Sequence, residues 1–115
     1  MEKRINQRFQ SIAKAKINGA DYGELLLKDI SITGCCLEST MQIELGKGIR
    51  HRIEIIPEKA AGIGKFEIVA ELKWTESGGY STDFGFSILE SPKGKLFQRY
   101  VDYLTWRTTG NVSPA

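Results

Sequence analysis

The chain has 115 residues, of which 16 are lysine or arginine and 14 are aspartate or glutamate, so its formal net charge is +2. A chain of this length forms one domain that buries a core without a disulfide or a metal ion. Its hydrophobic content of 41% excludes an intrinsically disordered or collagen-like chain. The first residues lack the apolar segment of a secretion signal, and no apolar run is long enough for a membrane helix. We therefore expect a cytoplasmic protein that does not insert into membranes.

The basic residues are concentrated at the start of the chain. Residues 1–16 carry five basic side chains and one acidic side chain, a net charge of +4, whereas the remaining residues have a net charge of −2. A basic segment on a slightly acidic body favours a local anion-binding site over a basic surface that covers the whole domain.

A period-two alternation of apolar and polar residues predicts short strands in the first half of the chain. The first strand covers 13–17 and ends at the turn signal Asn18-Gly19. The second covers 24–32. Gly34 breaks it, and the chain continues in extended form over 36–38. A further strand is expected over 49–57.

Residues 66–88 show the clearest strand pattern. Apolar and polar side chains alternate over 66–74 and over 80–88, and the turn Ser77-Gly78-Gly79 separates the two segments. This pattern predicts an antiparallel hairpin. We expect both tryptophans of the chain in the core or against a helix. The alternation places five side chains on the inner face of the first hairpin strand: Phe66, Ile68, Ala70, Leu72 and Trp74.

After residue 90 the spacing of apolar residues becomes helical. Ser91 is suited to cap a helix and Pro92 to occupy its first position. One helix face then carries four apolar side chains, Phe97, Tyr100, Val101 and Leu104.

The predicted elements define an all-β domain with one helix. A sheet made of so many hairpins avoids open edges by closing into a barrel, and the helix can cover one end of it. We expect an arm over 1–8, a β-barrel over 9–90, a helix over 91–109 and a tail over 110–115.

The residue types that carry most enzyme chemistry are scarce. His51 is the one histidine, and it lies between Arg50 and Arg52 in a predicted strand, where we expect it to be solvated. Cys35 and Cys36 are adjacent, so we expect two reduced, mostly buried thiols. These three residues offer no metal-ligand set at a recognised spacing. We expect no enzyme activity, no metal and no cofactor.

Two short motifs suggest a binding site. Arg4 and Arg8 are four residues apart, and Asp29, Ser31 and Gly34 follow in a second motif. Arginine presents a planar fork of donors that matches a phosphate or the O6/N7 edge of guanine. A carboxylate accepts hydrogen bonds from the opposite guanine edge. Asp29 and Ser31 would face the same side of a strand, and Gly34 would admit a sharp turn or a close ligand.

The order RxxxR and then DxSxxG resembles the PilZ domain, a bacterial receptor module for cyclic di-GMP. The resemblance implies a six-stranded antiparallel β-barrel with a C-terminal helix. It also implies that Arg4 and Arg8 grip the phosphates and the guanine Hoogsteen edges of cyclic di-GMP. Asp29 and Ser31 would contact the ligand from the barrel surface, and Gly34 would shape the turn.

The resemblance further implies an adaptor that passes the signal to a protein effector, with motility as the regulated process that the family suggests. Three other functions are weighed against it. The first is a PilZ-like interaction module that does not bind nucleotide. The second is a small barrel that binds single-stranded nucleic acid, which the charge distribution disfavours. The third is an enzyme. We expect no nucleic-acid partner.

Overall fold

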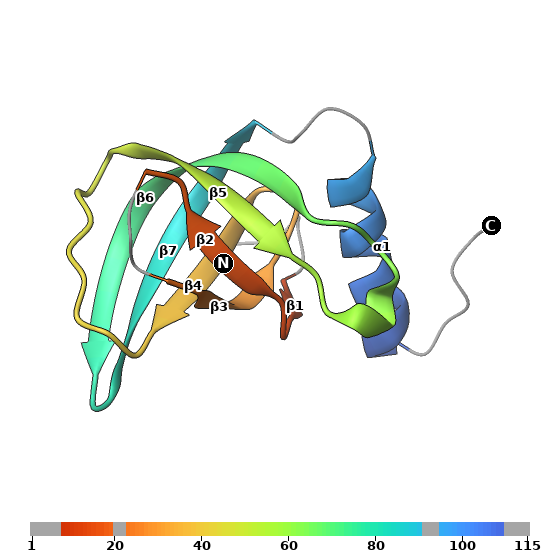
Figure 1. Cartoon of the computed structure of the whole chain (residues 1–115), viewed down its shortest axis with the longest axis horizontal. Helices are drawn as coiled ribbons and strands as arrows, with labels where there is room; N and C mark the ends of the chain where they lie inside the picture. The colour runs from red at the N-terminus through yellow and green to blue at the C-terminus, as the bar shows by residue number, and fades with distance from the viewer. Residues whose placement is uncertain (1–7, 20–22, 91–94, 110–115) are drawn as a thin grey trace, which may run out of the picture.

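The computed structural model describes residues 8–19, 23–90 and 95–109. Within these ranges, seven strands, a short 3-10 helix η1 and one α-helix follow one another (Figure 1). The bounds are β1 Phe9–Gln10, β2 Lys14–Ile17, β3 Leu25–Ile30, β4 Gly34–Ser39, β5 Arg50–Ile56, η1 Lys59–Ala61, β6 Phe66–Gly78, β7 Ser81–Glu90 and α1 Leu96–Thr109.

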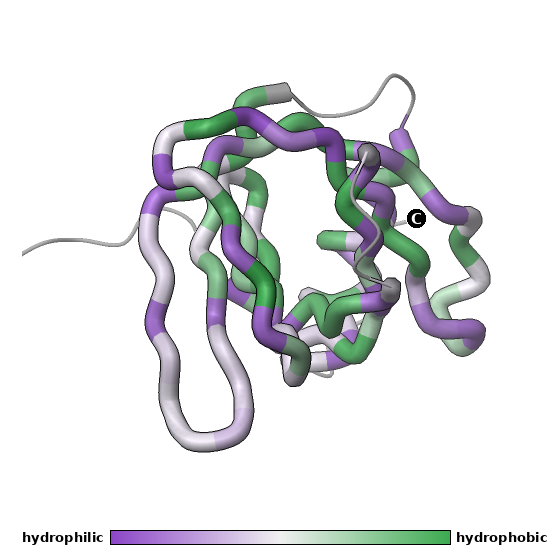
Figure 2. Tube along the Cα trace, turned by 60° about the vertical axis from the view of Figure 1, so that its left-hand side comes forward, coloured by the Kyte–Doolittle hydropathy of each residue, from purple (hydrophilic) through white to green (hydrophobic). Residues whose placement is uncertain are grey.

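Strands β2 to β7 form the predicted barrel. Their order is β3-β2-β5-β6-β7-β4, and a β3–β4 pairing closes the ring, with every neighbouring pair antiparallel. The two-residue β1 is added to β3 at Phe9↔Ile30 and Gln10↔Asp29. The expected six-stranded antiparallel barrel with one C-terminal helix is therefore confirmed, and Figure 2 shows the strands curving into a ring.

The barrel interior holds most of the side chains that the alternation pointed inward. Leu27, Ile53, Ile55 and Leu72 have no exposed surface. The ring of Phe66 lies 6.0 Å from that of Phe97, which seats α1 against one end of the barrel. All four side chains of the predicted helix face are buried, as expected: Phe97, Tyr100, Val101 and Leu104.

The described part of α1 begins at Leu96, where the amide of Arg99 donates to the carbonyl of Lys95 at 2.8 Å. The predicted cap Ser91 and the predicted first residue Pro92 lie outside the described residues. The predicted tail lies outside them as well.

Trp74 is not in the core, which corrects the prediction for this residue. The β6–β7 register shifts between Leu72 and Trp74, so a β-bulge turns Trp74 to the outer face, where it is 42% exposed. Trp106 of α1 is 44% exposed and packs against the ring of Tyr103 at 6.3 Å. The alternation of β6 is broken at the bulge, and a rule based on period two alone misplaces the residue that follows.

Candidate functional site

Arg8 and Asp29 meet on the outer surface of the barrel. The pairing of Gln10 with Asp29 fixes the chain beside β3, and Arg8 precedes this pair. Nη1 of Arg8 donates to Oδ1 of Asp29 at 2.7 Å, and both side chains stay about one-third exposed. The structure thus joins the two sequence motifs through one ion pair. Arg4 lies outside the described residues, and its place in the site remains a prediction.

A β-bulge in β3 turns Asp29 outward. The β3–β4 register shifts between Leu27 and Asp29, and both Leu27 and Ile30 point into the core. Two residues therefore lie between core positions where regular alternation allows one. The extra residue is Lys28, and Asp29 faces Arg8 as a result.

Ser31 has a different position from the one expected. Strand β3 ends at Ile30, and Ser31 begins a turn, so it does not share the outer face with Asp29. Its side chain is 2% exposed, and its Oγ accepts hydrogen bonds from the amides of Thr33 and Gly34 at 3.2 Å each. In this arrangement Ser31 holds the turn that presents Gly34.

Gly34 is required by close approach rather than by backbone conformation. The φ angle of Gly34 is not positive, so its backbone conformation is open to other residues. A Cβ at this position would lie 2.9 Å from the backbone oxygen of Phe86 and 3.0 Å from Nη2 of Arg8. The missing side chain lets the guanidinium lie directly on the backbone of β4.

One row of residues crosses four strands from this ion pair. Asp29 pairs with Cys36, Cys36 with Gly85, and Gly85 with Trp74. The core neighbours of Gly85 are Phe84 and Phe86, so the bare Cα of Gly85 faces outward and the indole of Trp74 lies over it. Three strand spacings of about 4.8 Å separate Asp29 from Trp74, roughly 14 Å in all.

Trp74 was missed as a candidate site residue because the alternation placed it inside. The signal that could have identified it is Gly85, a glycine in the middle of a regular strand. Such a glycine often marks a position where another group approaches the backbone.

The two cysteines are free and buried, as expected. Burial raises the pKa of Cys35 to about 12, with Cys36 adding to the effect. Burial, and then the carboxylate of Asp29, raises the pKa of Cys36 to about 11. Both thiols are therefore protonated at neutral pH and are poor nucleophiles.

His51 is half-buried, which corrects the expectation of a solvated side chain. It lies on the same strand face as Ile53, and its ring packs edge-on to Phe86 at 6.1 Å. Burial lowers its pKa, and its Nε2 is buried without a hydrogen-bond partner among the described residues. Its surroundings are those of a packed side chain at the barrel wall.

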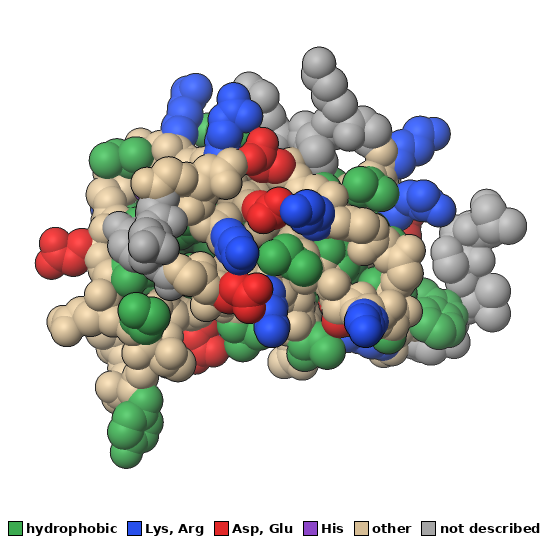
Figure 3. All heavy atoms as spheres, in the orientation of Figure 1, with side chains coloured by type: hydrophobic (Ala, Val, Ile, Leu, Met, Phe, Trp, Pro, Cys, Tyr) green, Lys and Arg blue, Asp and Glu red, His purple; other side chains and the backbone are tan. Residues whose placement is uncertain are grey.

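The remaining surface shows no concentration of one charge on the face seen in Figure 3, where basic and acidic side chains are interspersed. Among the described residues, no cluster of three or more histidine, cysteine or acidic side chains has the arrangement of a metal site. Within the same part of the chain, no helix is both long and apolar enough to span a membrane.

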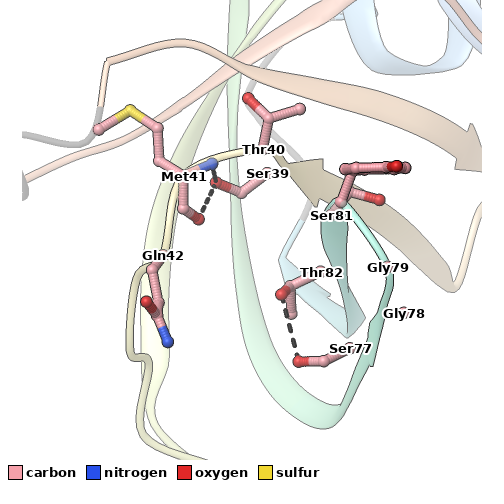
Figure 4. Close-up of a pocket in the computed structure, with 10 residues that line it drawn as sticks. Ser39, Thr40, Met41, Gln42, Ser77, Gly78, Gly79, Ser81 and Thr82 are labelled. Atoms are coloured by element: carbon pink, nitrogen blue, oxygen red, sulfur yellow. Dashed lines mark hydrogen bonds between the residues drawn. The ribbon is translucent and has the colours of Figure 1, made fainter.

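A separate hollow of about 360 Å³ lies beside the tip of the β6–β7 hairpin (Figure 4). It lies between residues 39–42 and residues 77–82. Several of its hydroxyl groups are engaged locally, for example in a 3.2 Å hydrogen bond between Ser77 and Thr82. It contains none of the predicted site residues.

Three solved structures share the fold over nearly the whole chain. The inhibitor of motility MotI/DgrA of Bacillus subtilis matches with a TM-score of 0.76 and 17% identity, over 97% of this chain and 54% of that protein. YcgR of Escherichia coli in complex with c-di-GMP matches with a TM-score of 0.70 and 16% identity, over 95% of this chain and 48% of that protein. The PilZ domain of YcgR with c-di-GMP matches with a TM-score of 0.68 and 19% identity, over 96% of this chain and 100% of that domain.

These matches define the fold as that of a PilZ domain. The chain spans about half the length of MotI/DgrA and of YcgR. Its match to the isolated PilZ domain of YcgR covers the whole length of that domain. No protein-family model and no curated protein sequence matches it.

Proposed function

We propose that this chain is a receptor for cyclic di-GMP and that the ligand binds over Arg8 and Asp29 on the outer face of the barrel. The observation that carries the proposal is the ion pair of these residues above the bare backbone of Gly34. Support also comes from the fold, because two solved structures of this fold contain c-di-GMP.

The chemistry of each group suits this ligand. Arg8 offers a fork of donors to a phosphodiester or to the O6/N7 edge of guanine. Asp29 accepts from the N–H groups of the opposite guanine edge. Arg4 is proposed to add a second guanidinium from the arm. Trp74 offers an exposed aromatic face about 14 Å from Asp29, counted as three strand spacings, on which a base can stack.

Ligand binding is proposed to reorganise the arm. In the structure Arg8 is neutralised by Asp29, so a dianionic ligand competes with the carboxylate for the same guanidinium. The arm would then present a new surface to a protein effector. No catalytic step is proposed, and the thiols and His51 are left outside the site.

Calorimetric titration of the chain with cyclic di-GMP, with separate titrations of GTP and cyclic di-AMP as controls, tests the function. We expect saturable binding of cyclic di-GMP alone. Arg8→Ala and Arg4→Ala should each weaken binding about tenfold or more, since a charge-assisted hydrogen bond contributes about 1.5–3 kcal/mol. Arg52→Ala removes an exposed arginine that pairs with Glu67 at 3.3 Å and should bind normally.

A folded chain that gives no heat of binding with cyclic di-GMP would contradict the receptor proposal. It would favour the alternative, a PilZ-like interaction module that does not bind nucleotide. Equal losses in Arg8→Ala and Arg52→Ala would show that only net charge matters and would overturn the assignment of the site.

A further inference from the structure

We propose that Lys28 is an additional ligand-binding residue of this site and that Asp83 holds it away from the ligand in the unbound protein. The inference rests on the proposed receptor function and extends it to a residue outside both sequence motifs. It is carried by the bulge in β3 and by the ion pair that Lys28 makes across β4.

The bulge places Lys28 and Asp29 on the same side of the barrel. Their neighbours Leu27 and Ile30 are both fully buried, and both charged side chains make their contacts on the outer face. Consecutive Cα atoms are about 3.8 Å apart. A ligand seated on Asp29 is therefore within the length of a lysine side chain from Lys28.

The ammonium group of Lys28 is held away from Asp29 by a single described partner. Its Nζ donates to Oδ2 of Asp83 at 2.8 Å, across the intervening strand β4, and the lysine side chain remains 39% exposed. The hydrogen bond with Asp83 raises the pKa of Lys28, so the side chain is charged at neutral pH. A long, flexible lysine stem allows the charge to move from one partner to another.

Asp83 belongs to a row of carboxylates. It pairs in register with Glu38 on β4 and with Glu76 on β6. A hollow of about 260 Å³ lined by Lys28, Asp83 and Glu76 opens beside this row. The acidic row repels an anion, so an anionic ligand is favoured on the Asp29 side of Lys28 and disfavoured over Asp83.

The charge balance of the candidate site favours recruitment of Lys28. Among the described residues of the site, the charge of Arg8 is already cancelled by Asp29. Cyclic di-GMP carries two negative phosphodiesters. An approaching dianion adds a second acceptor for the ammonium group, and the two acceptors then compete for Lys28.

Five proteins titrated with cyclic di-GMP test this competition: the parent, Lys28→Met, Lys28→Arg, Asp83→Asn and the double variant Lys28→Met/Asp83→Asn. Lys28→Met should weaken binding about tenfold, and Lys28→Arg should retain it. Asp83→Asn should strengthen binding several-fold because it releases the ammonium group. The gain should disappear in the double variant, since its cause is the lysine.

Lys65→Met is the matched control, because Lys65 is an exposed lysine in a 3.4 Å ion pair with Glu54 elsewhere on the barrel. Equal affinities of Lys28→Met and Lys65→Met would overturn the inference. So would a gain from Asp83→Asn that persists without Lys28, which would indicate a general charge effect. A parent chain that binds no cyclic di-GMP would instead refute the receptor function on which the inference rests.

Discussion

At the scale of single residues, the candidate site depends on an absent side chain. Gly34→Ala would place a Cβ 2.9 Å from the backbone oxygen of Phe86, which cannot move without shifting β7. It would also crowd Nη2 of Arg8 at 3.0 Å. We expect a loss of about 1–3 kcal/mol in the free energy of unfolding, measured in urea, together with weaker cyclic di-GMP binding.

Gly64→Ala is the matched control, because a Cβ there meets nothing within 4 Å and the backbone has no positive φ. It should leave both stability and binding within experimental error. If Gly34→Ala behaved like Gly64→Ala, the close packing of Arg8 on the β4 backbone would not be maintained in solution.

The same scale shows what the sequence could not predict. The motifs identified Arg8, Asp29 and Gly34, and the structure brings these three together. Ser31 and Trp74 were misplaced because both predictions assumed uninterrupted alternation. A turn begins at Ser31, and a bulge precedes Trp74. Both interruptions depend on how neighbouring strands pair, which local sequence does not specify.

At the scale of elements, a polar network attaches α1 to the barrel. Tyr100 donates to Glu58 at 2.7 Å and shares a 2.6 Å hydrogen bond with Ser11. Arg107 bonds to the same Glu58 and to the carbonyl of Gln10 in β1. The helix is therefore connected to the strand that follows Arg8.

Tyr100→Phe should destabilise the chain by about 1–2 kcal/mol, because the phenol is buried and its partner Ser11 would lose an acceptor. Urea denaturation followed by circular dichroism measures this loss. Tyr103→Phe is the control, since the Tyr103 ring stacks on Tyr100 at 6.2 Å and keeps this contact without its hydroxyl. A similar loss in both variants would argue against the network as the anchor of the helix.

The elements themselves were largely predictable from apolar spacing. Strands that contribute core side chains on alternate positions, such as β5 and the first half of β6, match the predicted segments closely. The second half of β6 was unexpected, since the strand continues to Gly78 beyond its last buried residue, Leu72. Pairing with β7 maintains this extension without a core to pack against.

At the scale of the whole molecule, barrel closure creates the surface on which the candidate site lies. The β3–β4 pairing brings Asp29 beside Cys36, and β4–β7 pairing continues the row to Gly85. The same closure buries several groups that ionise at high pH. The fold therefore couples a surface suited to an anion with a core that is sensitive to alkaline conditions.

The buried thiols predict the direction of this sensitivity. Their ordinary pKa is near 9, and the fold raises it to about 12 for Cys35 and about 11 for Cys36. Between pH 9 and 11 the unfolded chain loses these protons while the folded chain keeps them. The unfolded state then binds fewer protons, so the free energy of unfolding falls as pH rises, by at most about 1.4 kcal/mol per pH unit for each group.

Urea denaturation at pH 8, 9 and 10, at constant ionic strength, measures this slope. The stability contributed by the protonated thiols is fully present below pH 9 and should decline steadily above it. Cys36→Ala removes one of the two groups and should give a shallower slope whatever its stability at pH 8. Equal slopes in the parent and in Cys36→Ala would mean that Cys36 ionises as readily in the folded chain as in the unfolded one, so that β4 is open to solvent at the centre of the candidate site.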